Sequence, residues 1–465
     1  MSRSNDLATT SPTVVSDKAN TSAGYLDLPS GTTAQRPETA TSGNLRYNTE
    51  VNQLEFYSGT TWVAANESTP TISSISGNIY VGLTSNLTIS GGNFNVSNVS
   101  VQWLEGSTIL ATNANLTPTN DSSITIAVPS QVYGQTIGDT ISIKILNAGT
   151  VASNASTKTV LALPSGGTII TSGGYYYHKF TSTGTTYFVN TLANLSVDYL
   201  IVAGGGGGGT EGGGGGAGGF RYQTSQTLAN TGSTDYPVVV GAGGAGGDFQ
   251  TSGSTNGSPS SFNSHSTVGG GAGSNESATY QQNSLSGGLG HAGGSGGGGG
   301  YYHETGGSGT SGQGNDGGDG IVSSPHYGTG GGGGAGSAGV DATHSGGGAG
   351  GDGVSNFVGN NVANTTEFLL ASVAGTDASN NATTSSSSGT LYIAGGGGGA
   401  GNSNGTNASG GKGGGGRGEA NGTSPNPVST AGLDGTGSGG GGGAENGGHG
   451  ADGGDGIVII RYVLP

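Results

Sequence analysis

The stretch Tyr199-Leu200-Ile201-Val202-Ala203 runs directly into six glycines, Gly204 to Gly209. A strand-like apolar phrase followed by nearly pure glycine is the dominant pattern of the second half of the chain, where 94 of the 106 glycines follow Pro164. An ordered glycine in a helix or strand interior costs roughly 0.5–1 kcal/mol relative to alanine. An ordered glycine field must therefore gain something from its missing side chains.

Two structures are compatible with such runs. One is a flexible low-complexity segment, the usual meaning of glycine and serine richness. The other is a bundle of extended polyglycine helices with polyproline II geometry, which have about three residues per turn and no internal hydrogen bonds. Each backbone N–H and C=O must then find its partner on a neighbouring helix. A collagen triple helix is excluded because the Gly-X-Y period is absent.

The phrases at the ends of the glycine field favour the ordered bundle. The field closes on Ile457 to Pro465, an apolar β-branched stretch typical of a buried strand that completes a domain. Tyr199 to Gly205 is echoed at Leu391 to Gly396, and Gly317 to Val322 is echoed at Gly453 to Val458. Repeated units of this kind predict a layered architecture.

Two further apolar phrases precede the field. Tyr175 to His178 and Tyr187 to Val189 are predicted strands, with Gly173-Gly174 marking a turn before the first. We expect them to pack with Tyr199 to Val202 and with the C-terminal strand. The resulting small β base would hold the glycine runs, which project away from it.

The flanking phrases carry a family resemblance. Gly166 to Tyr175, Phe180 to Gly184 and Val197 to Gly205 resemble the glycine-rich domain of bacteriophage tail fibres, as do Tyr236 to Gly244 and the Gly-Asp-Gly-Ile-Val ending. The resemblance covers about the last 300 residues. Related tip adhesins of contractile-tailed phages imply a sandwich of polyglycine helices whose variable loops contact the host receptor.

Composition narrows the class of protein. With 465 residues, 8% charged, 9 Phe and 2 Trp, the chain is too long for one compact domain and too poor in large apolar groups for a big core. A net charge of −16 argues against binding to nucleic acid or to anionic lipid. There is no cysteine, hence no disulfide framework. Neither a signal-peptide core nor a bilayer-spanning run is seen, so we expect a virion component made in the host cytoplasm, without membrane insertion.

Residues 1–68 are predicted to form a virion-attachment region. The pairs Leu45/Tyr47 and Leu54/Phe56 alternate with polar residues and predict short strands, with Trp62 as an anchor. The phrase resembles one that recurs in phage tail-fibre and virion structural proteins, which implies attachment to other tail or baseplate proteins; a generic β-hairpin is the alternative. Because two or three strands alone are marginally stable, we expect docking onto a neighbour or oligomerisation, with a homotrimer as one option.

Residues 69–163 are predicted to form an immunoglobulin-like spacer. Strand-like runs separated by turn residues indicate a β-sandwich; they lie at 86–90, 99–103, 123–128 and 140–145. Leu87 to Phe94 and Val99 to Val101 resemble the immunoglobulin-like transcription-factor (TIG) domain family. Phe94 and Trp103 are the expected core residues.

Several motifs in the glycine field look chemical. Gly241 to Gly246 matches G-x-G-x-x-G and Gly293 to Gly297 matches G-x-S-x-G, but neither precedes a predicted helix. Four Gly-Asp motifs, at Asp316, Asp319, Asp452 and Asp455, are similar to calcium-binding glycine repeats. The nine-residue period of those repeats is missing, so we expect these motifs to form structural turns. The histidines have no zinc-ligand spacing. We expect no metal, no cofactor and no enzymatic activity.

Aromatic, amide and imidazole groups interrupt the glycine runs and are the candidate receptor-binding residues. Rings stack on glycans and proteins while amides give directional hydrogen bonds. The candidates are Tyr301, Tyr302, His303, Tyr327, Tyr280 and Phe357. In the alternative interpretation these aromatics wedge between glycine helices as internal spacers.

The expected protein is mainly β, elongated and multi-domain. An N-terminal β-hairpin attachment region (1–68) is followed by an immunoglobulin-like sandwich (69–163) and by a polyglycine II helix sandwich on a small β base (164–465). The functional expectation is a tail fibre or adhesin that recognises a host cell-surface glycan or outer-membrane protein. The alternative is a purely structural virion fibre or decoration protein.

Overall fold

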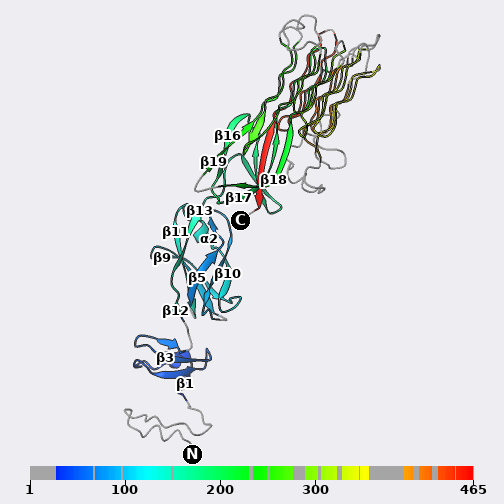
Figure 1. Ribbon diagram of the computed structural model, residues 1–465. Coiled ribbons are helices and arrows are strands. Elements are labelled where there is room, and N and C mark those ends of the chain that lie inside the picture. Colours follow the sequence, from blue (N-terminus) through cyan, green and yellow to red (C-terminus); the bar gives the residue numbers. More distant parts are fainter. Residues whose placement is uncertain are drawn as a thin grey trace, which may run out of the picture. The chain divides into compact units, whose positions relative to one another are not determined.

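The structure is a computed structural model, and the parts of the chain that it describes divide into two compact units, Met1–Leu161 and Ala162–Pro465. Each unit is described by itself. Strands supply nearly all of the regular secondary structure, as expected (Figure 1). The described residues are 28–65, 69–95, 98–147, 151–229, 234–248, 252–275, 289–301, 305–321, 327–344, 346–355, 392–401, 408–420, 428–445 and 447–463.

A small four-stranded sheet begins the first unit, in the order β1-β2-β3-β4. Its elements are β1 (Ser30–Gly31), η1 (Thr33–Gln35), β2 (Leu45–Asn48), β3 (Gln53–Tyr57) and β4 (Trp62–Ala64). The predicted pairing of the Leu45 and Leu54 phrases is confirmed, with Leu45 opposite Phe56 and Tyr47 opposite Leu54. One face carries a buried ionic cluster, in which Glu55 contacts Arg36 at 2.6 Å and Arg46 at 3.4 Å.

The charge of Glu55 is maintained despite its burial. Burial acts to raise the pKa of this carboxyl, but hydrogen bonds from Arg36 and Asn48 outweigh it and leave the pKa below its ordinary value.

The rest of the first unit is the expected β-sandwich. One sheet has the order β10-β7-β5, and the other has the order β6-β13-β11-β8-β9 with β12 on the side. The elements are β5 (Thr71–Ser76), β6 (Ile79–Tyr80), β7 (Asn86–Gly92), β8 (Val99–Glu105), β9 (Thr108–Leu116), β10 (Ser123–Ala127), α2 (Ser130–Tyr133), β11 (Thr140–Asn147), β12 (Val151–Ala152) and β13 (Ser156–Leu161). Phe94 and Trp103 lie in its core, as predicted, and the Trp103 indole donates to Asn113 Oδ1 at 2.7 Å.

Two packed sheets form the base of the second unit. Their orders are β14-β15-β22-β17-β18 and β16-β19-β20-β21. The strands are β14 (Thr168–Ser172), β15 (Tyr175–Phe180), β16 (Gly184–Asn190), β17 (Leu195–Val202), β18 (Phe220–Leu228), β19 (Thr234–Val240), β20 (Ser260–Phe262), β21 (His265–Thr267) and β22 (Ile457–Val463). The four phrases expected to make this base do so, because β15, β17 and β22 pair side by side and β16 joins the facing sheet.

The central strands of the base are buried on both faces. Tyr199 and Ile460 face the second sheet within one hydrophobic cluster, whereas Leu200 and Ile459 belong to a second cluster on the opposite face. Ala217, Ile393 and Ala394, which come from glycine-rich segments, complete that second cluster. A strand segment covered on both faces needs apolar residues at every position, which explains the unbroken runs Tyr199 to Val202 in β17 and Ile457 to Ile460 in β22.

Polyglycine helices extend from this base as long, closely packed rods (Figure 1). The N–H groups of Gly204 and Gly207 donate to the segment 255–258, those of Gly205 and Gly208 to 451–454, and those of Gly206 and Gly209 to 213–216, with N···O distances of 2.8 to 3.0 Å. The segment that accepts the hydrogen bond changes at each residue and recurs at every third residue, which indicates a helix with about three residues per turn. The polyglycine II expectation is therefore confirmed.

The same six residues also accept hydrogen bonds from three other segments. Gly204 and Gly207 accept from Gly270 and Gly273 of one neighbour, and the remaining carbonyls alternate between two more. The other donors are Gly244, Gly247, Gly440 and Gly443. Six neighbours thus surround one central helix, and every N–H and C=O of Gly204 to Gly209 is paired.

Close approach, not backbone freedom, is what requires glycine here. The φ angles of Gly204 to Gly209 do not enter the left-handed region. A Cβ on Gly206 would instead lie deep inside the van der Waals radius of the Gly271 carbonyl oxygen, and its five neighbours in the run meet carbonyls in the same way. Any side chain in the middle of the array must therefore separate two helices.

The echoed phrases do not repeat the strands. Leu391 lies outside the described residues, and Ile393 forms only an isolated bridge with Val354. Ile321 is likewise extended without belonging to a strand, and its partner Val322 lies outside the described residues. A strand forms at 199–202 and 457–463 because those copies enter the base sheet, whereas the other copies remain in the array.

Removal of the C-terminal strand tests the dependence of the array on its base. β22 lies between β15 and β17, so deleting 457–465 should unfold residues 162–456 and make them sensitive to protease. Deletion of 464–465 alone is the control and should change nothing. Unchanged protease resistance in the larger deletion would contradict the assignment of β22 as the central strand.

Substitution within the array tests its packing. We expect Gly206→Val to destabilise the second unit by roughly 2–4 kcal/mol, because the side chain overpacks the helix and breaks hydrogen bonds to its neighbours. Gly92→Ala is the control, since its Cβ would meet only the Thr71 hydroxyl at 3.5 Å. Thermal melting measures both variants, and an unchanged melting temperature for Gly206→Val would argue for a flexible glycine segment.

His178 should make the stability of the base depend on pH. Its imidazole is fully buried, with Nδ1 2.8 Å from the Gly166 carbonyl, and burial lowers its pKa from 6.5 to about 4. Between these two pH values the unfolded chain binds a proton that the folded chain does not. Stability is therefore complete above pH 6.5 and is lost as the pH falls towards 4, by on the order of 3 kcal/mol in total.

Denaturant unfolding at a series of pH values measures this dependence. His178→Phe should reduce the pH dependence between pH 6.5 and 4 but not abolish it, because burial also lowers the pKa of His291, whereas His344→Phe, at an exposed position, should retain it in full. A wild-type protein whose unfolding free energy is constant across this range would contradict the prediction.

Candidate functional site

The polyglycine array has two ends. At the base end the runs join β strands, as Ala203 follows β17 and Gly241 follows β19. At the other end, here called the distal end, the run that leaves β17 reaches Thr210 and the chain returns through Gly212 to Gly219 towards β18. Connections between successive runs therefore gather at one of two places.

Single polar side chains close the distal end. The Asn275 Oδ1 accepts from the backbone N–H of both Thr210 and Ser254 at 3.1 Å. The Thr210 hydroxyl donates to the Gly448 carbonyl at 3.0 Å, and the Thr329 hydroxyl donates to the Gly212 carbonyl at 2.8 Å. These buried groups satisfy backbone atoms where the glycine runs stop, so they hold the connections in place.

Carboxylates supply acceptors at the distal end and along the outer helices. Glu211 accepts from the Gly447 N–H at 3.1 Å and Glu419 from the Ala444 N–H at 3.0 Å. The four Asp residues of the Gly-Asp motifs accept from backbone N–H groups of neighbouring runs in the same way, at 2.7 to 2.9 Å. The turn interpretation of these motifs is wrong, since Asp316, Asp319, Asp452 and Asp455 all lie in extended segments.

The spacing of these aspartates follows from the helix. Asp316 and Asp319 are three residues apart, as are Asp452 and Asp455, so each pair lies on one side of a helix with about three residues per turn. Each pair faces a single neighbouring run, as Asp316 and Asp319 bind Gly309 and Gly306. Within the described residues, no cluster of three or more His, Asp or Glu side chains could hold a metal ion.

Two of the six candidate receptor residues, Tyr301 and Tyr327, lie together at the distal end. Their ring centroids are 5.6 Å apart with the planes tilted by 52°. Tyr327 is half-buried, but Tyr301 is only 6% exposed and belongs to the core. Sequence reasoning expected an exposed Tyr301, and this expectation is corrected: the ring follows the run ending at Gly300 and packs inside, as in the spacer alternative.

The remaining candidates, Tyr280, Tyr302, His303 and Phe357, lie outside the described residues. The residues that flank them are nevertheless placed. Asn275 and Leu289 flank the Tyr280 connection, and Tyr301 and Thr305 flank Tyr302 and His303, all at the distal end.

The connection that carries Phe357 has its flanking residues at a different end of the array. The connection that carries it starts after Ser355 and ends before Tyr392, beside the Val354–Ile393 bridge. Ile393 belongs to the hydrophobic cluster that covers the base. The residues that flank this connection therefore lie at the base end, whereas Tyr301, Tyr327 and the residues that flank the other candidates lie at the distal end.

Sequence reasoning missed the residues that organise the distal end. Thr210 and Thr329 directly adjoin a glycine run and Asn275 lies one residue beyond one, and that position is the signal that could have identified them. His178 was also missed, because its neighbours resemble an ordinary strand; it packs edge-on against Phe188 with ring centroids 4.9 Å apart.

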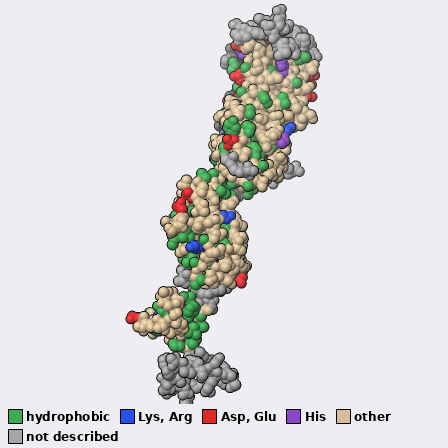
Figure 2. Space-filling view, turned by 60° about the vertical axis from the view of Figure 1, so that its left-hand side comes forward, with side chains coloured by type: hydrophobic (Ala, Val, Ile, Leu, Met, Phe, Trp, Pro, Cys, Tyr) green, Lys and Arg blue, Asp and Glu red, His purple; other side chains and the backbone are tan. Residues whose placement is uncertain are grey.

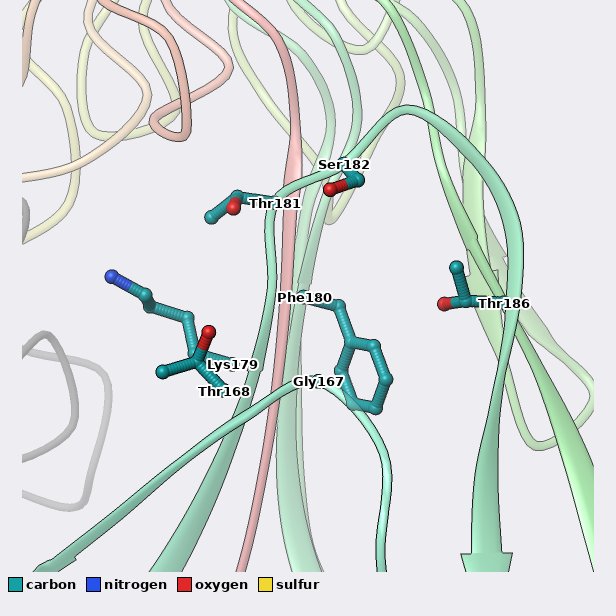
Figure 3. A pocket seen from close by; sticks show the side chains of 7 residues that line it. All are labelled: Gly167, Thr168, Lys179, Phe180, Thr181, Ser182 and Thr186. Carbon is teal, nitrogen blue, oxygen red and sulfur yellow. The ribbon is translucent and has the colours of Figure 1, made fainter.

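A shallow pocket lies in the base, between the start of β14, the end of β15 and β16 (Figure 3). It is lined by Gly167, Thr168, Lys179, Phe180, Thr181, Ser182 and Thr186. The Phe180 ring occupies its middle, while the Lys179 ammonium points away from Thr186 (Figure 3). Burial lowers the pKa of Lys179. Phe180 is only 4% exposed and belongs to the hydrophobic core of the base, so its ring is not open to a ligand, and no carboxylate lines the pocket.

Fold and site together define a class: a rigid polyglycine II array on a β base that displays connections at one end. A family model described as "Glycine-rich domain" matches residues 180–463. This match covers more than half of the chain and begins within β15 and ends with β22. The chain therefore belongs to the glycine-rich domain family. No curated protein matches the sequence. Among the described residues, no helix has the length and apolar character needed to cross a membrane.

Proposed function

We propose that this protein is a bacteriophage tail fibre or tip adhesin that recognises a host cell-surface receptor through the distal connections of its glycine-rich domain. The receptor class is a surface glycan or an outer-membrane protein. The N-terminal region attaches the chain to other tail or baseplate proteins of the virion. The protein is made in the host cytoplasm, and binding rather than catalysis is its role.

The observation that carries the proposal is the separation of scaffold from connections. Most hydrogen bonds of the array join backbone atoms, so apart from the few side chains that close its distal end the array places little demand on the sequence between runs. Several connections are flanked by distal residues, among them 249–251, 276–288, 302–304, 322–326, 402–407 and 421–427. The bridge between Gly328 and Gly401 joins residues that flank two of these connections. A scaffold of this kind suits recognition, which needs variable segments held on a rigid support.

The composition of the distal connections supports receptor binding. Tyr280, Tyr302, His303 and the neighbouring amides supply rings for stacking and donors for directional hydrogen bonds. Few such groups are needed, because a small number of residues usually dominates a binding interface.

One observation favours a structural fibre or decoration protein instead. Tyr301, which sequence reasoning assigned to the receptor surface, is buried. If the other aromatics serve in the same way, the distal connections would be inert and the array would act as a spacer.

Adsorption to cells distinguishes the two functions. The purified full-length protein should bind host cells, and the triple substitution Tyr280→Ser, Tyr302→Ser, His303→Ser should weaken binding by at least about tenfold, since individual contacts contribute ~1–2 kcal/mol. Tyr187→Ser is the matched control, because Tyr187 is 53% exposed on β16 of the base. Circular dichroism verifies that all variants fold.

Undiminished binding by the triple variant would remove these connections from the receptor site. Failure of the unmodified protein to bind any host of the phage would favour the structural fibre.

A further inference from the structure

The segment Pro29 to Arg36 packs against the small N-terminal sheet and is here called the strap; it contains β1 and η1. β1 is only two residues long and pairs in parallel with β2. The Tyr47 N–H of β2 donates to the Pro29 carbonyl at 2.8 Å, and the Thr49 N–H donates to the Gly31 carbonyl at 3.0 Å. The strap thus covers the edge of β2, and an uncovered strand edge presents unpaired backbone groups to other chains.

Polar contacts attach the strap to the sheet. Its apolar residues, Pro29 and Ala34, are both exposed. Side chains alternate between the two faces of a strand, so the apolar Leu45 and Tyr47 of β2 lie on the face opposite to Arg46. Hydrophobic side chains gather on one side of this sheet in Figure 2. The strap binds the side chains of the other, charged face, so the hydrophobic effect contributes little to its attachment.

The carboxylate of Glu55 links most of these polar contacts. Arg36, the last residue of the strap, donates to it at 2.6 and 3.3 Å. On β2, Arg46 lies 3.4 Å from the same carboxylate, and the Asn48 amide donates to it at 3.3 Å. Arg46 and Asn48 also donate to a carbonyl and to a hydroxyl of the strap, each at 3.1 Å. Glu55 therefore binds the strap directly and positions the two β2 side chains that bind it.

Two cations share this one carboxylate. Glu55 and Arg46 are 3% and 4% exposed, whereas the Arg36 side chain is 32% exposed. These two arginines are the charged groups that face Glu55, and Trp62, whose ring centre lies 5.7 Å from the Arg46 guanidinium, is uncharged. If Glu55 lost its charge, the two guanidinium groups would repel each other, and a buried ion pair that loses one partner is strongly destabilised. Arg36 can move into solvent with the strap, but Arg46 is fixed in β2.

We propose that the strap is a charge-controlled cover of the β2 edge, which stays closed while Glu55 is ionised and detaches when this carboxylate is neutralised, with β2, β3 and β4 still paired. Burial acts to raise the pKa of Glu55, but hydrogen bonds from Arg36 and Asn48 leave it below 4.5. The strap is therefore closed above pH 4.5 and opens as the pH falls through this lowered pKa. Glu50, whose pKa is lowered by its hydrogen bonds with Thr33, adds an exposed contact. This inference is independent of the receptor proposal.

Hydrogen exchange resolved to single amides tests the strap in the full-length protein. The amides of Tyr47 and Thr49 donate to strap carbonyls and report on the strap. The amides of Tyr57 and Ala65 donate to carbonyls outside the strap and report on the rest of the sheet. Protection factors are compared, because they correct for the effect of pH on the intrinsic exchange rate.

Removal of the charge at neutral pH should open the strap. Glu55→Gln should lower the protection factors of Tyr47 and Thr49 by at least about tenfold, because a partly buried ion pair is lost, and leave the rest of the sheet protected. Glu50→Gln is the matched control and should change them little, since Glu50 is exposed and accepts from one strap N–H. Unchanged protection of Tyr47 and Thr49 in Glu55→Gln would overturn the proposal.

Two further measurements cover the case in which Glu55→Gln fails to fold. Arg36→Gln removes the arm of the strap but leaves Glu55 paired with Arg46, and it should expose the same two amides. In the unmodified protein, lowering the pH below 4.5 should expose them before the amides of Tyr57 and Ala65. Loss of protection at all four amides together in both measurements would show that the strap does not open separately, and the proposal would be wrong.

Discussion

The structure depends on backbone hydrogen bonds that leave each polyglycine helix in three directions. In Gly204 to Gly209 the donors reach three neighbours and the acceptors reach three others, so one helix serves as the centre of a six-membered shell. This arrangement requires carbonyl oxygens where Cβ atoms would otherwise lie. Paired backbone amides therefore hold the array together in place of the hydrophobic core of an ordinary domain. The unfavourable ordering of glycine is offset by hydrogen bonds that neither side chains nor solvent interrupt.

Backbone groups at the ends and at the sides of such a lattice have no glycine run to pair with, and different residues bind them at each place. At the sides, aspartates spaced by three residues accept the N–H groups that would otherwise face solvent. At the distal end, Thr210, Asn275 and Thr329 bind the last backbone groups. At the base end, β17 and β22 continue directly from glycine runs and bury their apolar side chains on both faces. Some of the acidic residues of the chain thus accept hydrogen bonds that the array needs, beyond any effect on solubility.

The lattice and the connections between its runs have separate roles. A lattice of backbone atoms tolerates any connection that starts and ends at the right places, so the distal segments are free to differ while their support stays constant. The N-terminal sheet also departs from an ordinary core, since its Arg46, Asn48 and Glu55 are buried while Leu45 and Tyr47 are exposed.

The sequence by itself determined the architecture. Glycine runs without a collagen period, bounded by the phrases at Tyr199 and Ile457, were sufficient for polyglycine helices on a β base, and alternation at Leu87 and Val99 was sufficient for the sandwich. Only the tertiary structure decided which echoed phrases become strands, that Tyr301 is buried, and that the Phe357 connection leaves from the base end. The physical reason is that glycine runs look identical along the chain. Their neighbours, and hence the end at which each connection lies, are set by long-range backbone pairing that leaves no local mark on the sequence.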